Sequence, residues 1–124
     1  MQARRLAPLT EQSMLTRSGC IEVEGRDERK EWAEMLEAMG RLGIGAAEQK
    51  QIFDVVAAVL HLGRVQFASD KSQAAEHGDN QARIVDTAPM QAVAELLEVE
   101  PGPLLGAMTS YKVREMRQVP PSGP

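Results

Sequence analysis

Aromatic side chains are scarce in this chain, at 3% of its 124 residues: one Trp, one Tyr and two Phe. A core must therefore be filled by aliphatic side chains and by the 7 methionines, which pack adaptably and specify shape loosely. Hydrophobic residues at 43% and charged residues at 26% are still typical of a globular chain and exclude wholesale disorder. We expect a single domain of marginal stability.

The chain also has no excess of positive charge. Its formal net charge of -4 argues against a nucleic-acid or membrane-surface partner, because both need a basic field. The longest apolar stretch, Val55 to Leu60, is far too short to span a bilayer. The charges are unevenly distributed, with a basic tip at Lys112, Arg114 and Arg117 near the end. Acidic residues gather in one stretch: Glu22, Glu24, Asp27, Glu28, Glu31, Glu34 and Glu37.

Cysteine and histidine are rare as well. Cys20 is alone, so no internal disulfide is possible, and no long apolar run follows Arg4 and Arg5, so we expect no secretory leader and a reducing cytoplasmic location. His61 and His77 have no partner at metal-ligand spacing, which predicts no metal site and two structural or exposed histidines. A nucleophilic Cys20 paired with His61 is the alternative to a small packed thiol, which fits better because no orienting group can be named.

A phosphate cradle is missing. Nucleotide hydrolysis needs a glycine-rich loop and a lysine that neutralises phosphate, and no Gly-Lys-Ser or Gly-Lys-Thr occurs. The glycine cluster from Gly40 to Gly45 follows no strand, so we interpret it as an interhelical turn. The carboxylates from Glu28 to Glu37 recur at helical spacing, and a solvated helix face explains them better than acid-base catalysis. We therefore assign no catalytic, cofactor-binding or metal-binding residue.

Apolar spacing predicts two helices in the middle of the chain. The first begins after Asp27, whose carboxylate can accept from free backbone N–H groups, and ends before Gly43. Its apolar face is expected to hold Trp32, Met35, Leu36, Met39 and Leu42. The second runs from about Gly45 to Gly63 and is apolar almost all the way round, which predicts burial on several sides.

Two further helices are expected later in the chain. One begins near Thr87 with proline in its first turn, and Met90, Val93, Ala94 and Leu97 should face inward. The other is short, from about Pro103 to Tyr111. Beyond it the pattern fades, and the proline-rich residues 119–124 predict a disordered tail.

Short strands are predicted at three places. Residues 20–25 alternate apolar and polar side chains and end at glycine, as a half-buried strand would. Residues 64–67 and 83–85 are expected to form a hairpin around a polar surface loop at 68–82. Residues 1–17 show no clear period and are interpreted as an irregular edge.

An ordered series of identities goes beyond these general patterns. It includes Ser18-Gly19-Cys20-Ile21, Glu34-Met35-Leu36-Glu37-Ala38-Met39, Leu42-Gly43-Ile44, Ile52-Phe53, Ala57-Ala58, Leu60-His61-Leu62-Gly63 and Phe67. In this order and spacing, the series resembles the myosin motor domain, in the upper actin-facing subdomain between the two switch loops. The resemblance implies a mainly α, bundle-like fragment with a small β-hairpin, part of a motor head of the P-loop NTPase superfamily. Residues 18–118 would be the partial motor domain.

The same resemblance implies a function for the parent protein. Myosins are ATP-driven, actin-based motors, cytoplasmic and associated with the cytoskeleton, with Mg-ATP as the nucleotide. The phosphate loop, both switches, the converter and the lever arm have no counterpart in this chain, so the chain alone is expected to have no ATPase activity. Its expected role is that of a scaffold that couples nucleotide state to the actin interface, packed on the remainder of the motor head.

By the same alignment, Lys112, Arg114 and Arg117 enter the loop often called the cardiomyopathy loop, part of the family's actin-binding face. The loop at 68–82 would be the variable surface loop that can approach the filament. Met14-Leu15-Thr16-Arg17 and Gly45 depart from the family pattern. An alternative from another class is a free-standing, non-catalytic module that binds actin or another protein, and a truncated product without function is a third.

Overall fold

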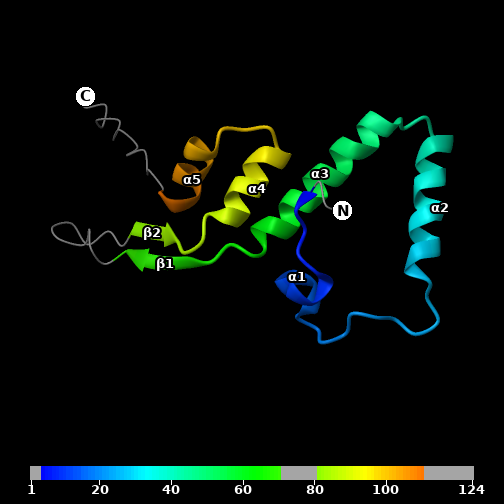
Figure 1. The fold of residues 1–124 in the computed structure, drawn as a ribbon, viewed down its shortest axis with the longest axis horizontal. Coiled ribbons are helices and arrows are strands. Elements are labelled where there is room, and N and C mark those ends of the chain that lie inside the picture. The colour runs from blue at the N-terminus through cyan, green and yellow to red at the C-terminus, as the bar shows by residue number, and fades with distance from the viewer. Residues whose placement is uncertain (1–3, 71–80, 111–124) are drawn as a thin grey trace, which may run out of the picture.

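The computed structural model describes residues 4–70 and 81–110. Its elements follow one another along the chain in Figure 1. They are a 3-10 turn η2 (Leu9–Glu11), α1 (Ser13–Thr16), α2 (Glu28–Arg41), α3 (Ala46–Leu62), β1 (Phe67–Asp70), β2 (Gln81–Ile84), α4 (Ala88–Leu96) and α5 (Pro101–Thr109). The predicted mainly helical fold with one small hairpin is confirmed.

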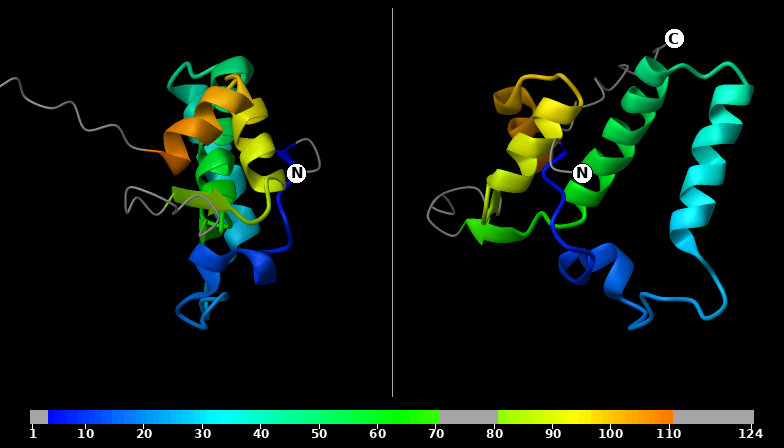
Figure 2. Two further views of the ribbon diagram at one scale, coloured as in Figure 1. Left: turned by 90° about the vertical axis from the view of Figure 1, so that its left-hand side faces the viewer. Right: turned by 45° about the vertical axis from the view of Figure 1, so that its right-hand side comes forward.

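The core of the described part lies between α3 and α4, which run side by side (Figures 1 and 2). Small residues of α3 allow close approach, and larger side chains of α4 fill the space between the helices. Met90 and Val93 are the largest fully buried side chains. The core consists of Ala57 and Ala58 from α3 and Met90, Ala92, Val93 and Ala94 from α4.

Helix α3 presents two stripes. The buried residues of α3 are Asp54, Ala57, Ala58 and His61, and an exposed apolar stripe consists of Ile52, Val55, Val56 and Val59. Both have the spacing i, i+3, i+4, i+7 of a single helix face. They are offset by two residues, which turns the helix by about 200°, so the stripes lie on opposite sides. The prediction that α3 is buried on several sides is therefore wrong within the described residues, which cover one face of the helix.

Helix α2 begins where the sequence predicts. The Asp27 carboxylate accepts from the backbone N–H of Lys30 at 3.1 Å. Gly43, with φ of +81°, ends the helix in the left-handed conformation that glycine adopts without strain. The segment from Gly40 to Gly45 is thus the interhelical turn that was predicted. Figure 1 shows α2 standing apart from the α3–α4 pair, and none of its residues is buried.

One aromatic contact joins α2 to α3. The rings of Trp32 and Phe53 lie with centroids 4.7 Å apart and planes tilted by 43°. Trp32 nevertheless remains 49% exposed and Leu42 80% exposed. The predicted apolar face of α2 therefore exists as a helix face, but the described residues leave it largely uncovered.

The hairpin and the last helix extend the α4 side. Strands β1 and β2 pair antiparallel with Phe67 opposite Ile84, so the hairpin is confirmed, with β1 three residues later than predicted and β2 beginning two residues earlier. Helix α5 packs against α4 and β2. Of the predicted loop at 68–82, residues 71–80 lie outside the described residues, as does the predicted tail.

Besides the burial of α3 on several sides, three predictions were wrong. The Cys20 thiol, expected to be packed, is exposed because the segment around it forms no strand. No strand forms at residues 20–25, because no neighbouring strand offers hydrogen-bond partners there and Gly25, with φ of +79°, turns the chain instead. Leu97, expected to face inward, is 37% exposed at the end of α4.

The N-terminal edge contains more structure than the sequence indicates. Residues of η2 and α1 wrap below the end of α3 in Figure 1. A Cβ atom placed on Gly63 would overlap the side chain of Met14. The side chain of Met14 in α1 therefore packs directly on the backbone where α3 ends, and a larger residue at position 63 would require that side chain to move.

Candidate functional site

The most connected polar cluster lies where the N-terminal segment crosses α3. Arg4 donates from Nε to Asp54 Oδ1 at 2.7 Å and from its terminal nitrogen to the Lys50 carbonyl at 3.5 Å. Lys50 Nζ binds the second carboxylate oxygen of Asp54. Arg4 also lies over the ring of Phe53, 5.9 Å from its centroid, within cation–π range. Asp54 is thereby paired on both oxygens at a site only 7% exposed.

The electrostatics of this cluster favour a charged Asp54. The hydrogen bond from Lys50 is the largest cause that holds the pKa of Asp54 below its usual value, and the bond from Arg4 acts in the same direction. Partial burial opposes both by disfavouring the charged form. The carboxylate is therefore a stable ion-pair centre, unlike a proton donor or acceptor, which would need a pKa nearer to neutrality.

His61 belongs to the same region. Its side chain is buried, and Nε2 lies 2.8 Å from the Arg4 carbonyl oxygen, so the ring nitrogen donates to the backbone of the N-terminal segment. Sequence interpretation of His61 as structural is consistent with this contact. His77 lies outside the described residues.

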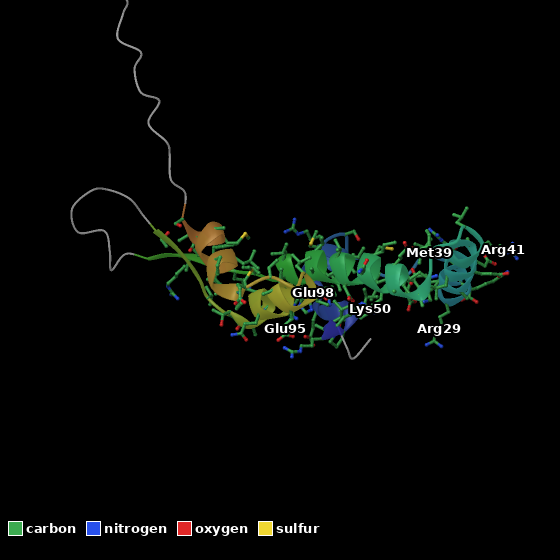
Figure 3. All side chains as sticks on the ribbon, turned by 90° about the horizontal axis from the view of Figure 1, so that it is seen from above. Arg29, Met39, Arg41, Lys50, Glu95 and Glu98 are labelled. Carbon is green, nitrogen blue, oxygen red and sulfur yellow. The ribbon has the colours of Figure 1, made fainter. Side chains whose placement is uncertain are left out.

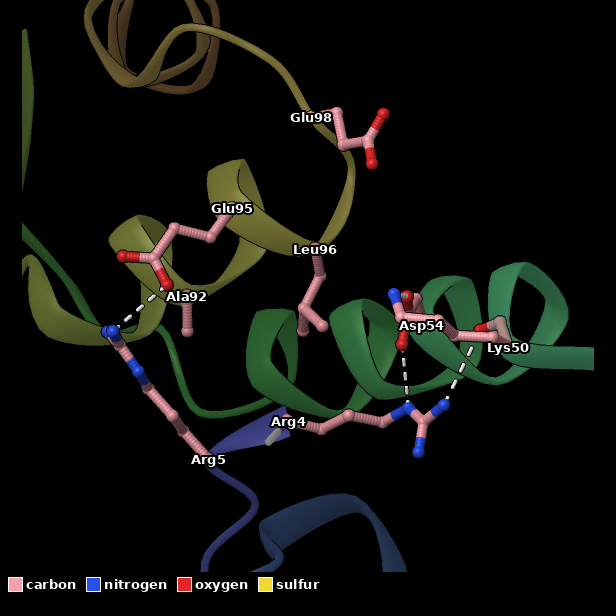
Figure 4. A pocket seen from close by; sticks show the side chains of 8 residues that line it. All are labelled: Arg4, Arg5, Lys50, Asp54, Ala92, Glu95, Leu96 and Glu98. Atoms are coloured by element: carbon pink, nitrogen blue, oxygen red, sulfur yellow. Dashed lines mark hydrogen bonds and ion pairs between the residues drawn. The ribbon is translucent and has the colours of Figure 1, made fainter. Parts of the chain in front are cut away.

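A polar cleft of about 450 Å³ opens between α3 and α4, with Arg4 and Arg5 along one side (Figure 4). Arg5 reaches Glu95 of α4 at 3.1 Å, whereas Arg4 reaches α3. Three cationic and three anionic side chains line the cleft, together with Ala92 and Leu96: Arg4, Arg5, Lys50, Asp54, Glu95 and Glu98. The charges balance, so the cleft has no net preference for an ion of either sign.

The remaining chemical candidates from the sequence are not brought together. Cys20 is exposed and its thiol donates to the Glu22 carbonyl at 3.1 Å, so Cys20 and His61 each have other partners and no nucleophile–base pair forms. In the part of the chain that the structure describes, no group of three or more His, Cys, Asp or Glu side chains could hold a metal ion. The described helices likewise include none that is long and apolar enough to cross a bilayer.

The acidic face of α2 is solvated, as predicted. Glu31 pairs with Arg26, which lowers the pKa of Glu31 and raises that of Arg26 through their hydrogen bond. Glu37 binds Arg41 at 2.5 Å, one turn further along. Viewed from above in Figure 3, Arg29 and Arg41 project outward from α2, away from the α3–α4 pair. These ion pairs lie on the exposed surface of α2 and form no enclosed site.

The basic tip Lys112, Arg114 and Arg117 lies outside the described residues, so its role stays a prediction. Conversely, sequence interpretation missed the Arg4–Asp54 cluster. Arg4 is 50 residues from Asp54 along the chain, and neither periodicity nor spacing relates them. The one available signal was an acid at Asp54 within an apolar helix, since a buried carboxylate requires a partner.

Comparison with known proteins extends across most of the chain. The family described as "Myosin head (motor domain)" matches residues 2–120. Myosin-1 of Aspergillus oryzae is 40% identical over 94 residues, which is 76% of this chain and 7% of that protein. Unconventional myosin-XV of Homo sapiens is 35% identical over 104 residues, 84% of this chain and 3% of that protein.

A third relative, Myosin-13 of Arabidopsis thaliana, is 51% identical over 59 residues, 48% of this chain and 4% of that protein. The chain thus spans less than a tenth of the length of these relatives. The chain belongs to the myosin motor-domain family.

Proposed function

We propose that this chain is a piece of an ATP-driven, actin-based motor and acts as a scaffold that couples nucleotide state to the actin interface. Its parent binds Mg-ATP through parts that have no counterpart here, and residues 18–118 belong to the upper, actin-facing subdomain. The expected partners are the actin filament and the remainder of the motor head. The parent is cytoplasmic and associated with the cytoskeleton.

The observation that carries the proposal is the double-faced helix α3. Its buried face packs on α4, while the stripe Ile52, Val55, Val56 and Val59 is 42% to 52% exposed on the opposite side. Together with the uncovered apolar face of α2, this stripe supports the proposal that the chain packs against further parts of a larger head. A helix contacted on both sides is suited to transmit displacement because packed elements move as rigid bodies.

Actin binding is assigned to the basic tip Lys112, Arg114 and Arg117, whose charges suit the acidic surface of a filament. Co-sedimentation of the 124-residue chain with filamentous actin tests this assignment. The double variant Lys112→Glu with Arg114→Glu should reduce pelleting. The matched control, Arg29→Glu with Lys30→Glu on α2, makes the same change of charge and should leave pelleting unchanged. Equal pelleting of the tip variant and the wild type would remove the tip from the interface.

The alternative is a free-standing, non-catalytic interaction module derived from a myosin head. The two proposals differ in whether the transcript continues upstream into a phosphate loop and downstream into the second switch. A continuous reading frame supports the motor, and actin-activated ATPase of that longer protein would be the corresponding activity. If no such frame exists, a chain that pellets with actin and has no ATPase activity supports the interaction module. A chain that neither pellets with actin nor hydrolyses ATP is an inert fragment.

A further inference from the structure

The N-terminal segment Arg4–Gln12, here called the strap, lies across α3 and reaches α4. Its first two residues make the fastening contacts. Arg4 binds Asp54 of α3 with its guanidinium and accepts from His61 with its carbonyl, and Arg5 binds Glu95 of α4. Figure 4 shows the two arginines diverging from adjacent backbone positions toward the two helices.

The strap and the helices are held by different forces. Among the described residues, the buried apolar side chains of the core all come from α3 and α4. The strap contacts the helices through ion pairs and hydrogen bonds, its apolar residues Leu6 and Ala7 are only half-buried, and Pro8 to Glu11 are exposed. Segments with few buried apolar contacts open at lower free energy than the cores they rest on. Opening of the strap therefore need not disturb the packing of α3 on α4.

Among the fastening contacts, the Arg4–Asp54 pair is the strongest. The Asp54 side chain is 11% exposed and that of Arg4 25%, whereas the Arg5 and Glu95 side chains are 63% and 58% exposed. Water screens the outer pair more effectively, and exposed ion pairs contribute little to stability. Loss of Arg4 leaves Asp54 paired with Lys50 but with one oxygen unpaired at a site with restricted access to water, so loss of the inner pair has the larger effect.

The far end of the strap is held both by bonds within the strap and by α1, because the Gln12 carbonyl accepts from the backbone N–H groups of Leu15 and Thr16. Gln12 is buried and donates from its side-chain amide to the Ala7 carbonyl at 2.9 Å. Its backbone N–H donates to the Leu9 carbonyl, and that of Glu11 donates to Pro8. These internal bonds make the segment one cooperative unit, with the Arg4 contacts at one end fixing it to α3.

We propose that Arg4–Gln12 is a releasable strap, which opens as a unit while α3 and α4 stay packed, when the Arg4–Asp54 ion pair is broken. Arg4 is thus a positioning residue for the cleft between the two helices. Opening withdraws two of its three cationic side chains and leaves Asp54, Glu95 and Glu98 facing it. With the strap closed, the charges that line the cleft balance. With the strap open, the cleft is acidic. This inference does not depend on the motor function.

Hydrogen exchange of the 124-residue chain, followed by mass spectrometry, tests the strap. In Asp54→Asn the amides of Glu11 and Gln12 should exchange about tenfold faster or more, the size expected for loss of one charged hydrogen bond. Amides in α4 should keep the wild-type rate. The control Glu31→Gln removes the exposed Arg26–Glu31 pair with the same change of charge, and should leave the strap unchanged.

The second variant, Arg4→Gln, breaks the same pair from the strap side and should give the same pattern if Asp54→Asn alone fails to fold. The double variant should be no faster in strap exchange than either single variant, because one contact is removed twice. Wild-type exchange of the strap in both single variants would overturn the proposal. So would equal acceleration of α4 amides or unfolding of both variants, since the strap would then be inseparable from the core.

Discussion

Helices α2 and α4 differ in how many of their residues are buried and in the signals at their ends. Helix α2 has 14 residues and none is buried, whereas α4 has 9 residues and five of them are buried. Helix α2 has local signals at both ends: a capping Asp27, and a glycine in the left-handed conformation at Gly43. Helix α4 has no side-chain cap from Thr87, although the Asp86 carboxylate accepts from the Ala88 N–H at 3.0 Å, and it ends at Leu96, two residues before Glu98 with φ of +55°.

The contrast shows two ways of making a helix. Helix α2 is specified by its own sequence, through the cap and the i,i+4 ion pairs Lys30–Glu34 and Glu37–Arg41. Helix α4 is specified by burial against α3, which tolerates poor ends because packing contributes more than capping. Changes in the core should therefore affect the whole α3–α4 unit, and changes in α2 should act locally.

The largest effect is expected from Met90→Ala. Met90 is 1% exposed between α3 and α4, and the change removes its packing and leaves a cavity, at a cost of about 2–5 kcal/mol. Thermal or urea unfolding followed by circular dichroism measures the loss. The matched control is Met35→Ala on α2, where the side chain is 39% exposed and the change should be nearly neutral. Equal destabilisation by both would show that α2 is as well packed as α4.

The next largest effect is the opening of the strap as pH falls. Because the pKa of Asp54 is lowered in the folded chain, its charge contributes stability above the ordinary carboxyl value, and this contribution is lost as pH falls through the lowered value. The strap should open below about pH 4, where unperturbed carboxyls also titrate.

Hydrogen exchange, corrected for the intrinsic rate at each pH, measures this opening. Glu95 and Glu98 also face the cleft, and Glu95 holds Arg5 in an ion pair, so the contribution of Glu95 must be separated from that of Asp54. Glu95→Gln removes that contribution and should leave the acid transition of the strap in place. A transition that disappears in Glu95→Gln, or that occurs in α4 at the same pH, would assign the effect to groups other than Asp54.

The helices were predictable from the sequence because their signals are local. Asp27, Gly43 and Gly63 mark ends by their conformational and hydrogen-bonding properties, and the apolar spacing of α3 and α4 marks the faces between those ends. Periodicity could not tell which apolar face of α3 would be covered, since Val55 and Ala58 are both apolar and yet lie on opposite stripes.

The strap was not predictable for a different reason. Arg4 and Asp54 meet only because the chain doubles back across α3, and such long-range ion pairs carry no periodic pattern. The strand predicted at residues 20–25 failed by the same logic, because alternation indicates a strand only where another strand is available to pair with it. The basic tip is the part of the candidate site that sequence alone still supports.

A smaller effect is expected from the cap of α2. Asp27→Ala removes the bond to the Lys30 N–H and should cost about 0.5–2 kcal/mol of helix stability, seen as faster amide exchange in the first turn of α2. Thr87→Ala is the matched control on α4, because Thr87 makes no capping hydrogen bond, and it should be neutral. A loss at Thr87 as large as that at Asp27 would contradict the division between a locally specified helix and a packed one.

The smallest effects are expected at the two helix ends, with opposite signs. Gly43→Ala places a Cβ in a left-handed conformation and should cost about 1 kcal/mol, whereas Glu98→Gly removes that strain from the end of α4 and should gain somewhat less, because glycine is more flexible when unfolded. No atoms lie within 4 Å of a Cβ at Gly43, so the cost there is conformational and free of steric overlap.

The two variants should also differ in how much of the molecule they affect. The stability lost in Gly43→Ala should appear as fraying of α2 alone in hydrogen exchange. The stability gained in Glu98→Gly should raise the unfolding midpoint of the α3–α4 unit, because stabilising any part of a cooperative unit stabilises the whole. If Gly43→Ala instead lowered the midpoint of α3 and α4, α2 would be energetically coupled to the core through Trp32 and Phe53. The aromatic contact would then join two regions that burial alone separates.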